Sequence, residues 1–96
     1  MTPGPETRIV RAIIASVSRR PRSWLVKIHG GPFQAAGIPD IIGCIDGRFV
    51  ALEVKVPGAR ATKLQELTLS RIAAAGGIAA VVTSVAEAES AVEGSR

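Results

Sequence analysis

The chain has 96 residues, enough for one domain with a modest core, because a domain of this size hides only about 60–65% of its unfolded surface. Hydrophobic residues make up 47% of the composition but aromatic residues only 3%, which predicts a core of aliphatic side chains. Twelve Lys and Arg against eight acids give a net charge of +4, which favours a polyanionic partner such as nucleic acid and disfavours a cationic one.

Cysteine usage and hydropathy bear on the compartment. Cys44 is the single cysteine, so no internal disulfide can form and a reducing compartment is indicated. The sequence shows neither a signal peptide nor a run of about 18 apolar residues, which predicts no membrane association. We therefore expect a cytoplasmic protein, with Cys44 as a small buried side chain in an apolar strand.

The predicted elements begin with a helix over residues 6–20, where apolar residues recur at helical spacing until Pro21 stops the pattern. A short β-prone strand follows at residues 24–28, and turn-forming residues then predict a loop up to residue 38. Trp24 is expected in the core, with base stacking as the alternative.

A hairpin is predicted in the middle of the chain. Two apolar, β-branched runs at residues 41–45 and 49–56 flank Asp46-Gly47, a pair that favours the positive φ angles of a tight turn. The two runs are therefore expected to pair as antiparallel strands.

The last part of the chain alternates helix and strand. A second helix is expected to begin at Thr62, where Gln65 completes a capping box, and to end before Gly76. A strand at residues 78–83 and a last helix after Ser84 follow. The order αβββαβα predicts an α/β fold in which a mixed sheet is flanked by helices and the last strand runs parallel to the third.

Three polar residues stand out in the predicted hairpin. Because side chains alternate along a strand, Glu53 and Lys55 share one face, about 6.6 Å apart. Asp40 and Glu53 lie equally far from the turn, so the hairpin brings the two carboxylates together, which is costly unless a cation lies between them. Oxygen ligands select a hard ion, and Mg²⁺ is typically held by one or two carboxylates. A solvated strand face with a weak charge pair is the alternative for Glu53 and Lys55.

With "GIPD" at residues 37–40, "EVK" at 53–55 and the downstream Gln65, the chain resembles the PD-(D/E)XK nuclease superfamily. Within it, the chain is similar to the stand-alone VRR-NUC domains of phages and bacteria. The resemblance covers about residues 6–83, including the "AAGG" turn after the second helix. It implies a restriction-endonuclease-like αβββαβ(α) fold, a single nuclease domain over residues 1–96, and a bacterial or phage-infected host cell.

The resemblance also implies a metal site. Asp40 and Glu53 would bind Mg²⁺, for which Mn²⁺ would substitute, together with the main-chain carbonyl of Val54. Glu6 matches an acid on the family's first helix that supports the metal through water or a second ion. As the alternative, Glu6 is simply a first-turn acid that complements the helix dipole.

Two further residues match catalytic positions of the family. Lys55 would position or deprotonate the attacking water and stabilise the charge that develops on phosphorus. Gln65 would orient Lys55 or the water, but its capping role competes, and we expect that both roles cannot be fully served at once.

Basic residues near the predicted site are candidate phosphate contacts, with ordinary solvated charges as the alternative. They are Arg19, Arg20, Arg22, Lys27, Arg60 and Lys63. His29 lies beside two glycines and could contact phosphate, but we expect it to be exposed and inert.

We expect a Mg²⁺-dependent DNA endonuclease that is selective for Holliday junctions or other branched DNA. Similarity to Holliday-junction resolvases implies a homodimer, because a two-fold junction needs two active sites. The alternatives are a nicking or restriction-type nuclease on ordinary duplex, and a catalytically silent nucleic-acid-binding module.

Overall fold

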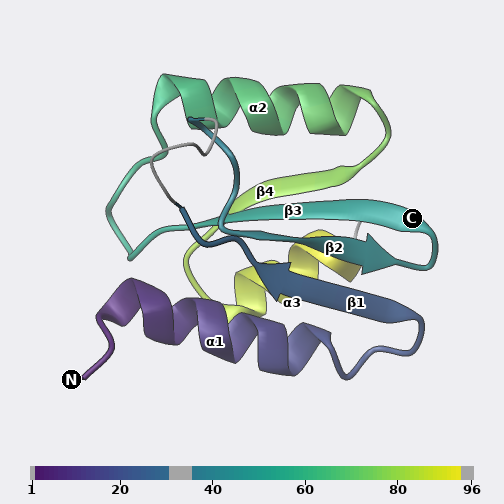
Figure 1. The fold of residues 1–96 in the computed structure, drawn as a ribbon, viewed down its shortest axis with the longest axis horizontal. Coiled ribbons are helices and arrows are strands. Elements are labelled where there is room, and N and C mark those ends of the chain that lie inside the picture. The colour runs from purple at the N-terminus through teal and green to yellow at the C-terminus, as the bar shows by residue number, and fades with distance from the viewer. Residues whose placement is uncertain (1, 31–35, 94–96) are drawn as a thin grey trace.

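The structure is a computed structural model that describes residues 2–30 and 36–93 (Figure 1). Its elements are the helices α1 (Pro5–Val17), α2 (Lys63–Ala74) and α3 (Val85–Glu93) and the strands β1 (Ser23–Lys27), β2 (Ile41–Ile45), β3 (Arg48–Val54) and β4 (Ile78–Val82). The order is the predicted αβββαβα. The loop predicted before β2 runs partly through residues 31–35, which lie outside the described residues.

The four strands form one sheet in the order β1-β2-β3-β4. β1 pairs antiparallel with β2 and β2 antiparallel with β3, whereas β4 lies parallel to β3. The parallel pair is connected through α2, as the predicted βαβ crossover requires. The predicted α/β fold with a mixed sheet is confirmed.

Helices cover the two faces of the sheet unequally. α1 and α3 lie together on one face, and α2 lies alone on the other (Figure 1). The core fills the space under α1 and α3, where Val10 and Ile13 of α1 pack against Val50, Leu52 and Val54 of β3. The buried core is aliphatic, as the composition predicted.

The β2–β3 hairpin has the turn that its sequence predicted. Asp46 and Gly47 have φ angles of 52° and 79°, the left-handed conformations of a two-residue hairpin turn. Arg22 Nε lies 2.8 Å from Asp46 Oδ1 and ties the start of β1 to this turn. The turn fixes the register on which the position of Asp40 relative to Glu53 depends.

Two predicted element ends differ from the structure by two or more residues. α1 ends at Val17 rather than at residue 20, because the main-chain N–H groups of Arg19 and Arg20 close a tighter turn onto Ser16 and Val17. β3 ends at Val54 rather than at residue 56, although the Lys55 N–H still donates to Val82.

Two predictions about buried side chains are wrong. Trp24 is 63% exposed, and Cys44 is exposed as well. Their strand neighbours Leu25 and Ile45 enter the core, so Trp24 and Cys44 lie on the opposite face of the sheet. That is the face on which α2 lies, but α2 packs mainly over β3 and β4 (Figure 1). In β1 the side chain that enters the core is Leu25.

No helix in residues 2–30 and 36–93 is both long enough and apolar enough to cross a membrane.

Candidate active site

Asp40 and Glu53 lie beside each other at one end of the β2–β3 hairpin. The strand register pairs Ile41 with Leu52, so one further step places Asp40 opposite Glu53. Asp40 Oδ2 accepts a 2.8 Å hydrogen bond from the main-chain N–H of Val54, which anchors the Asp40 carboxylate to β3. The equal spacing of the two acids from the turn therefore predicted their proximity correctly.

Glu53 is buried although it is an acid. It is 2% exposed and lies beneath α2, the one polar or charged residue among the buried residues of the described chain. Lys55 Nζ lies 3.4 Å from Glu53 Oε2, and the Gln65 side-chain amide donates to the same oxygen at 3.2 Å. Lys55 and Gln65, both singled out in the sequence, thus meet at the carboxylate of Glu53.

The protonation of Glu53 reflects its surroundings. Burial, together with repulsion from the neighbouring Asp40 carboxylate and a hydrogen bond shared with it, raises the pKa of the Glu53 carboxyl from 4.5 to about 7. The nearby Lys55 ammonium acts in the opposite direction. Near neutral pH, the site is therefore ready either to hold a proton or to exchange it for another cation.

Gln65 caps α2 and also contacts the buried Glu53. The side-chain Oε1 of Gln65 accepts a 2.8 Å hydrogen bond from the main-chain N–H of Thr62. In return, the main-chain N–H of Gln65 donates to the Thr62 hydroxyl at 3.2 Å. The Nε2 of the same amide remains free to donate to Glu53. The capping box therefore does not use the whole side chain, because an amide carries an acceptor and two donors on separate atoms. That Gln65 orients Lys55 or the water stays a prediction.

The donor atoms suit a hard divalent cation. Glu53 Oε1 is buried and has no hydrogen-bond partner among the described residues, which is costly for a carboxylate oxygen. A cation between Glu53 and Asp40 would remove that cost and the repulsion between the two acids. The described residues hold no group of three or more His, Cys, Asp and Glu side chains, so further ligands would be carbonyls, water or phosphate, as is common for Mg²⁺.

Glu6 and Val54 are placed differently from the central pair. Glu6 is exposed in the first turn of α1, and within the described chain no hydrogen bond or ion pair joins it to Asp40 or Glu53. α1 begins at the same end of the sheet at which β3 ends (Figure 1). Val54 packs its side chain in the core and is held to Asp40 through its main chain.

Four of the candidate phosphate contacts fall into two pairs. Arg20 donates to Glu89 of α3 at 2.6 Å, and Arg22 pairs with Asp46, so both guanidinium groups already have protein partners. Arg60 and Lys63 are exposed in the loop before α2 and at its start, on the side of the sheet where Gln65 meets Glu53.

The remaining candidates are dispersed. Arg19 and His29 are exposed, and Lys27 is half-buried at the end of β1.

One feature of the site's face was not recognised as functional in the sequence. Phe49 shares its face of β3 with Glu53 and is 45% exposed. The alternation of side chains along β3 was the available signal, but alternation does not show how much of a face a helix covers.

Comparison with known proteins rests on the fold. No protein-family model and no curated protein matches the chain. A solved structure described as a VRR_NUC domain superposes with a TM-score of 0.76 over 95% of this chain and 97% of that one, at 18% sequence identity. The chain therefore has the fold of that VRR_NUC domain.

Proposed function

We propose that the chain is a Mg²⁺-dependent nuclease that hydrolyses phosphodiester bonds in DNA. The observation that carries this proposal is the buried Glu53, which has one oxygen without a partner in the described part of the chain and lies beside Asp40 and the Lys55 ammonium. A purely structural acid would not be expected to lie buried beside a second carboxylate, because burying charge without full compensation is costly. The shared fold with a VRR_NUC domain supports the same chemistry.

The two acids and one carbonyl would hold the metal. Glu53 and Asp40 would bind Mg²⁺, or Mn²⁺ in its place, with the Val54 carbonyl beside them, and Glu6 would assist through water. When bound, the ion would activate a water molecule and neutralise charge on the scissile phosphate. The Asp40 carboxylate is kept in place by its bond to the Val54 N–H.

Lys55 and Gln65 would organise the reacting groups. The Lys55 side chain is only 17% exposed, and its ammonium lies near Glu53 Oε2 with further N–H groups available. It can donate to an attacking water or to a phosphate oxygen as negative charge develops there. Gln65 fixes the orientation of the Glu53 carboxylate from the first turn of α2.

The substrate we propose is branched DNA, cut by a homodimer that presents two active sites to a two-fold junction. Arg60 and Lys63 are the best-placed phosphate contacts, and Arg19, Arg20, Arg22 and Lys27 remain further candidates. The site of action would be the cytoplasm of a bacterial or phage-infected cell. Nicking of ordinary duplex and silent binding without cleavage are the alternatives that the test separates.

The test incubates labelled single strands, duplexes, flaps and four-way junctions with the protein in Mg²⁺ or Mn²⁺, and in EDTA. We expect cleavage of branched substrates that EDTA and Lys55→Ala abolish. Lys63→Ala removes the same charge from an exposed position, so it should weaken binding without abolishing cleavage. Cleavage of duplex alone would favour the nicking alternative, and tight binding without products would favour the silent module.

A further inference from the structure

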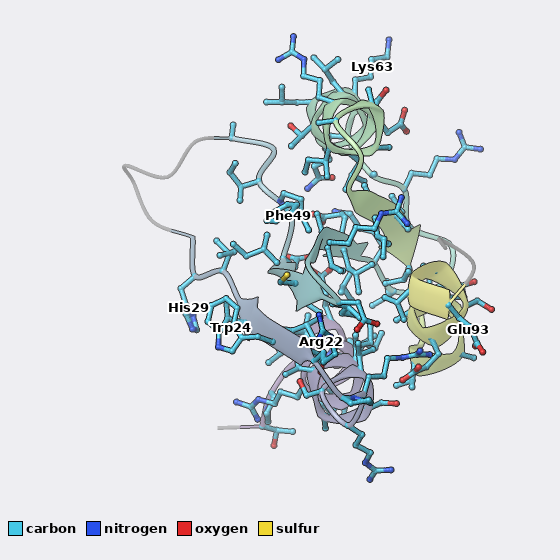
Figure 2. All side chains as sticks on the ribbon, turned by 90° about the vertical axis from the view of Figure 1, so that its right-hand side faces the viewer. Arg22, Trp24, His29, Phe49, Lys63 and Glu93 are labelled. Carbon is cyan, nitrogen blue, oxygen red and sulfur yellow. The ribbon has the colours of Figure 1, made fainter. Side chains whose placement is uncertain are left out.

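Two exposed aromatic side chains lie on the same face of the sheet as the candidate active site. Trp24 of β1 is 63% exposed and Phe49 of β3 is 45% exposed. Both pair in register with Cys44 of β2, so the three side chains form one row across the sheet. Figure 2 shows that Trp24 and Phe49 project from the face of the sheet on which α2 packs.

Packing does not explain these aromatic side chains. The core of the described residues is wholly aliphatic, and Trp24 and Phe49 are the aromatic residues that the structure describes. The row crosses β1, β2 and β3, and both aromatic side chains stay exposed because α2 packs mainly against β4. Two planar side chains in a sheet row, with a small residue between them, form a surface on which flat ligands can stack.

The row is continuous with the catalytic residues. Phe49, Ala51 and Glu53 project from the same face of β3, which places Phe49 about 13 Å from Glu53 along the strand. Trp24 lies two strands from Phe49, about 9.6 Å to the side. A strand of DNA whose phosphate lies at Glu53 would therefore carry its next few bases over this row.

Charge favours the approach of a polyanion from this side. Residues 55–74, which include α2 and the loop before it, contain four cations and one acid: Lys55, Arg60, Lys63, Arg71 and Glu66. α1 with the segment up to residue 22, and α3, contain four acids and five arginines on the other face: Glu6, Glu87, Glu89, Glu93, Arg8, Arg11, Arg19, Arg20 and Arg22. The open aromatic face is thus also the more positive side of the molecule.

We propose that Trp24 and Phe49 stack against unpaired nucleobases next to the phosphate that is cut. This inference rests on the proposed nuclease function and narrows its substrate class to DNA with unpaired nucleotides beside the cut. Bases within an intact duplex cannot offer their faces to these rings, because neighbouring base pairs cover them. A flap, a gap or a branch point whose central pairs have opened supplies exposed bases, and stacking on aromatic side chains tolerates any base sequence.

Trp24 is the chain's single tryptophan, so its fluorescence reports directly on this surface. In EDTA, where the proposed chemistry is silent, oligothymidylate should quench the emission and a blunt duplex of equal length should quench it much less. The affinity for the labelled single strand is then measured by anisotropy for Trp24→Leu, Trp24→Phe and Phe49→Leu. Leu67→Ala, which removes a 45%-exposed side chain from the outer surface of α2, is the matched control.

We expect Trp24→Leu and Phe49→Leu each to weaken single-strand binding by about 5-fold to about 150-fold. Trp24→Phe should retain most of the affinity, because it keeps an aromatic plane, and Leu67→Ala should match the wild type. Leucine keeps the apolar character of the side chain but lacks an aromatic ring. Unchanged single-strand binding by Trp24→Leu would therefore overturn the stacking proposal. If the Trp24 emission shifted with protein concentration alone, and Phe49→Leu abolished both that shift and a dimer, the face would belong to a second copy and the proposal would be overturned.

Stacking and chemistry can fail separately. If the quench and the loss of affinity occur but no DNA is cut in Mg²⁺, the nuclease proposal fails and the stacking surface stands. If wild type and Trp24→Leu cut and bind every substrate alike, the nuclease proposal stands and the stacking inference fails.

Discussion

The Gln65 side chain donates to the buried Glu53 carboxylate at 3.2 Å while its other end accepts from the main chain of Thr62. This contact joins the start of α2 to the end of β3, so the capping box of a helix also positions a candidate metal ligand. The local stability of the helix start and the geometry of the site are consequently linked through one amide.

Gln65→Glu should separate the two roles of this residue. Glutamate serves equally well in a capping box, so the start of α2 should be retained. The variant, however, replaces a donor with a second carboxylate beside Glu53, and a hydrogen bond to a charged group is worth about 1.5–3 kcal/mol. We expect cleavage to fall by about tenfold or more while the melting temperature changes little. If the melting temperature fell strongly while cleavage was retained, Gln65 would act only as a cap.

The raised pKa of Glu53 predicts how stability depends on pH in EDTA. The pKa is 4.5 in the unfolded chain and about 7 in the folded protein, so the folded state binds the proton more tightly. The contribution of this proton to stability is complete below pH 4.5 and is lost as pH rises through 7. It amounts to up to about 3 kcal/mol, since each pKa unit corresponds to about 1.4 kcal/mol.

Urea unfolding of wild type and Glu53→Gln between pH 4.5 and 8 measures this term. The neutral glutamine should remove it, so the wild type should lose stability relative to the variant as the pH rises. Glu66→Gln, a change at an exposed acid in the first turn of α2, controls for the removal of one negative charge. Parallel curves for wild type and Glu53→Gln would contradict the assignment.

Metal binding should stabilise the fold through the same pair of acids. Saturation at about 100 times the dissociation constant adds about 2.7 kcal/mol. We expect Mg²⁺ or Mn²⁺ to raise the melting temperature of the wild type and of Glu66→Gln, but not of Glu53→Gln. Because the cation displaces the Glu53 proton below pH 7, calorimetry in buffers of different ionisation enthalpy should detect proton release at pH 6. Equal stabilisation of Glu53→Gln would place the ion elsewhere.

Gly43 should tolerate no side chain. A Cβ at this position would lie 2.0 Å from the carbonyl oxygen of Trp24 and 2.8 Å from Leu25 Cα, both in the main chain of the neighbouring strand. Gly43→Ala must therefore push β1 away from β2, which we expect to cost about 3 kcal/mol or more. At Gly30 the added carbon would have no atom of the described residues within 4 Å, its chain neighbours aside, so Gly30→Ala serves as the control. Denaturant midpoints of the two variants test this, and equal midpoints would show that β1 moves freely.

The sequence predicted most of the fold because its signals are local. Helical spacing, the Asp46-Gly47 turn and the capping residue Thr62 each specify one element, and the hairpin turn alone sets the register that pairs Asp40 with Glu53. Tertiary facts were not accessible in the same way. Alternation along β1 assigned Trp24 to a face, but only the position of α2 over β3 and β4 decides that this part of the face is open.

The most direct test of the account is the rate at which a labelled four-way junction is cut in Mg²⁺ by wild type, Glu53→Gln and Glu66→Gln. If Glu53 holds the metal, the rate for Glu53→Gln should fall by about a hundredfold or more, whereas Glu66→Gln should cut like the wild type. Equal rates for wild type and Glu53→Gln would contradict the claim that this buried acid is the centre of a nuclease site.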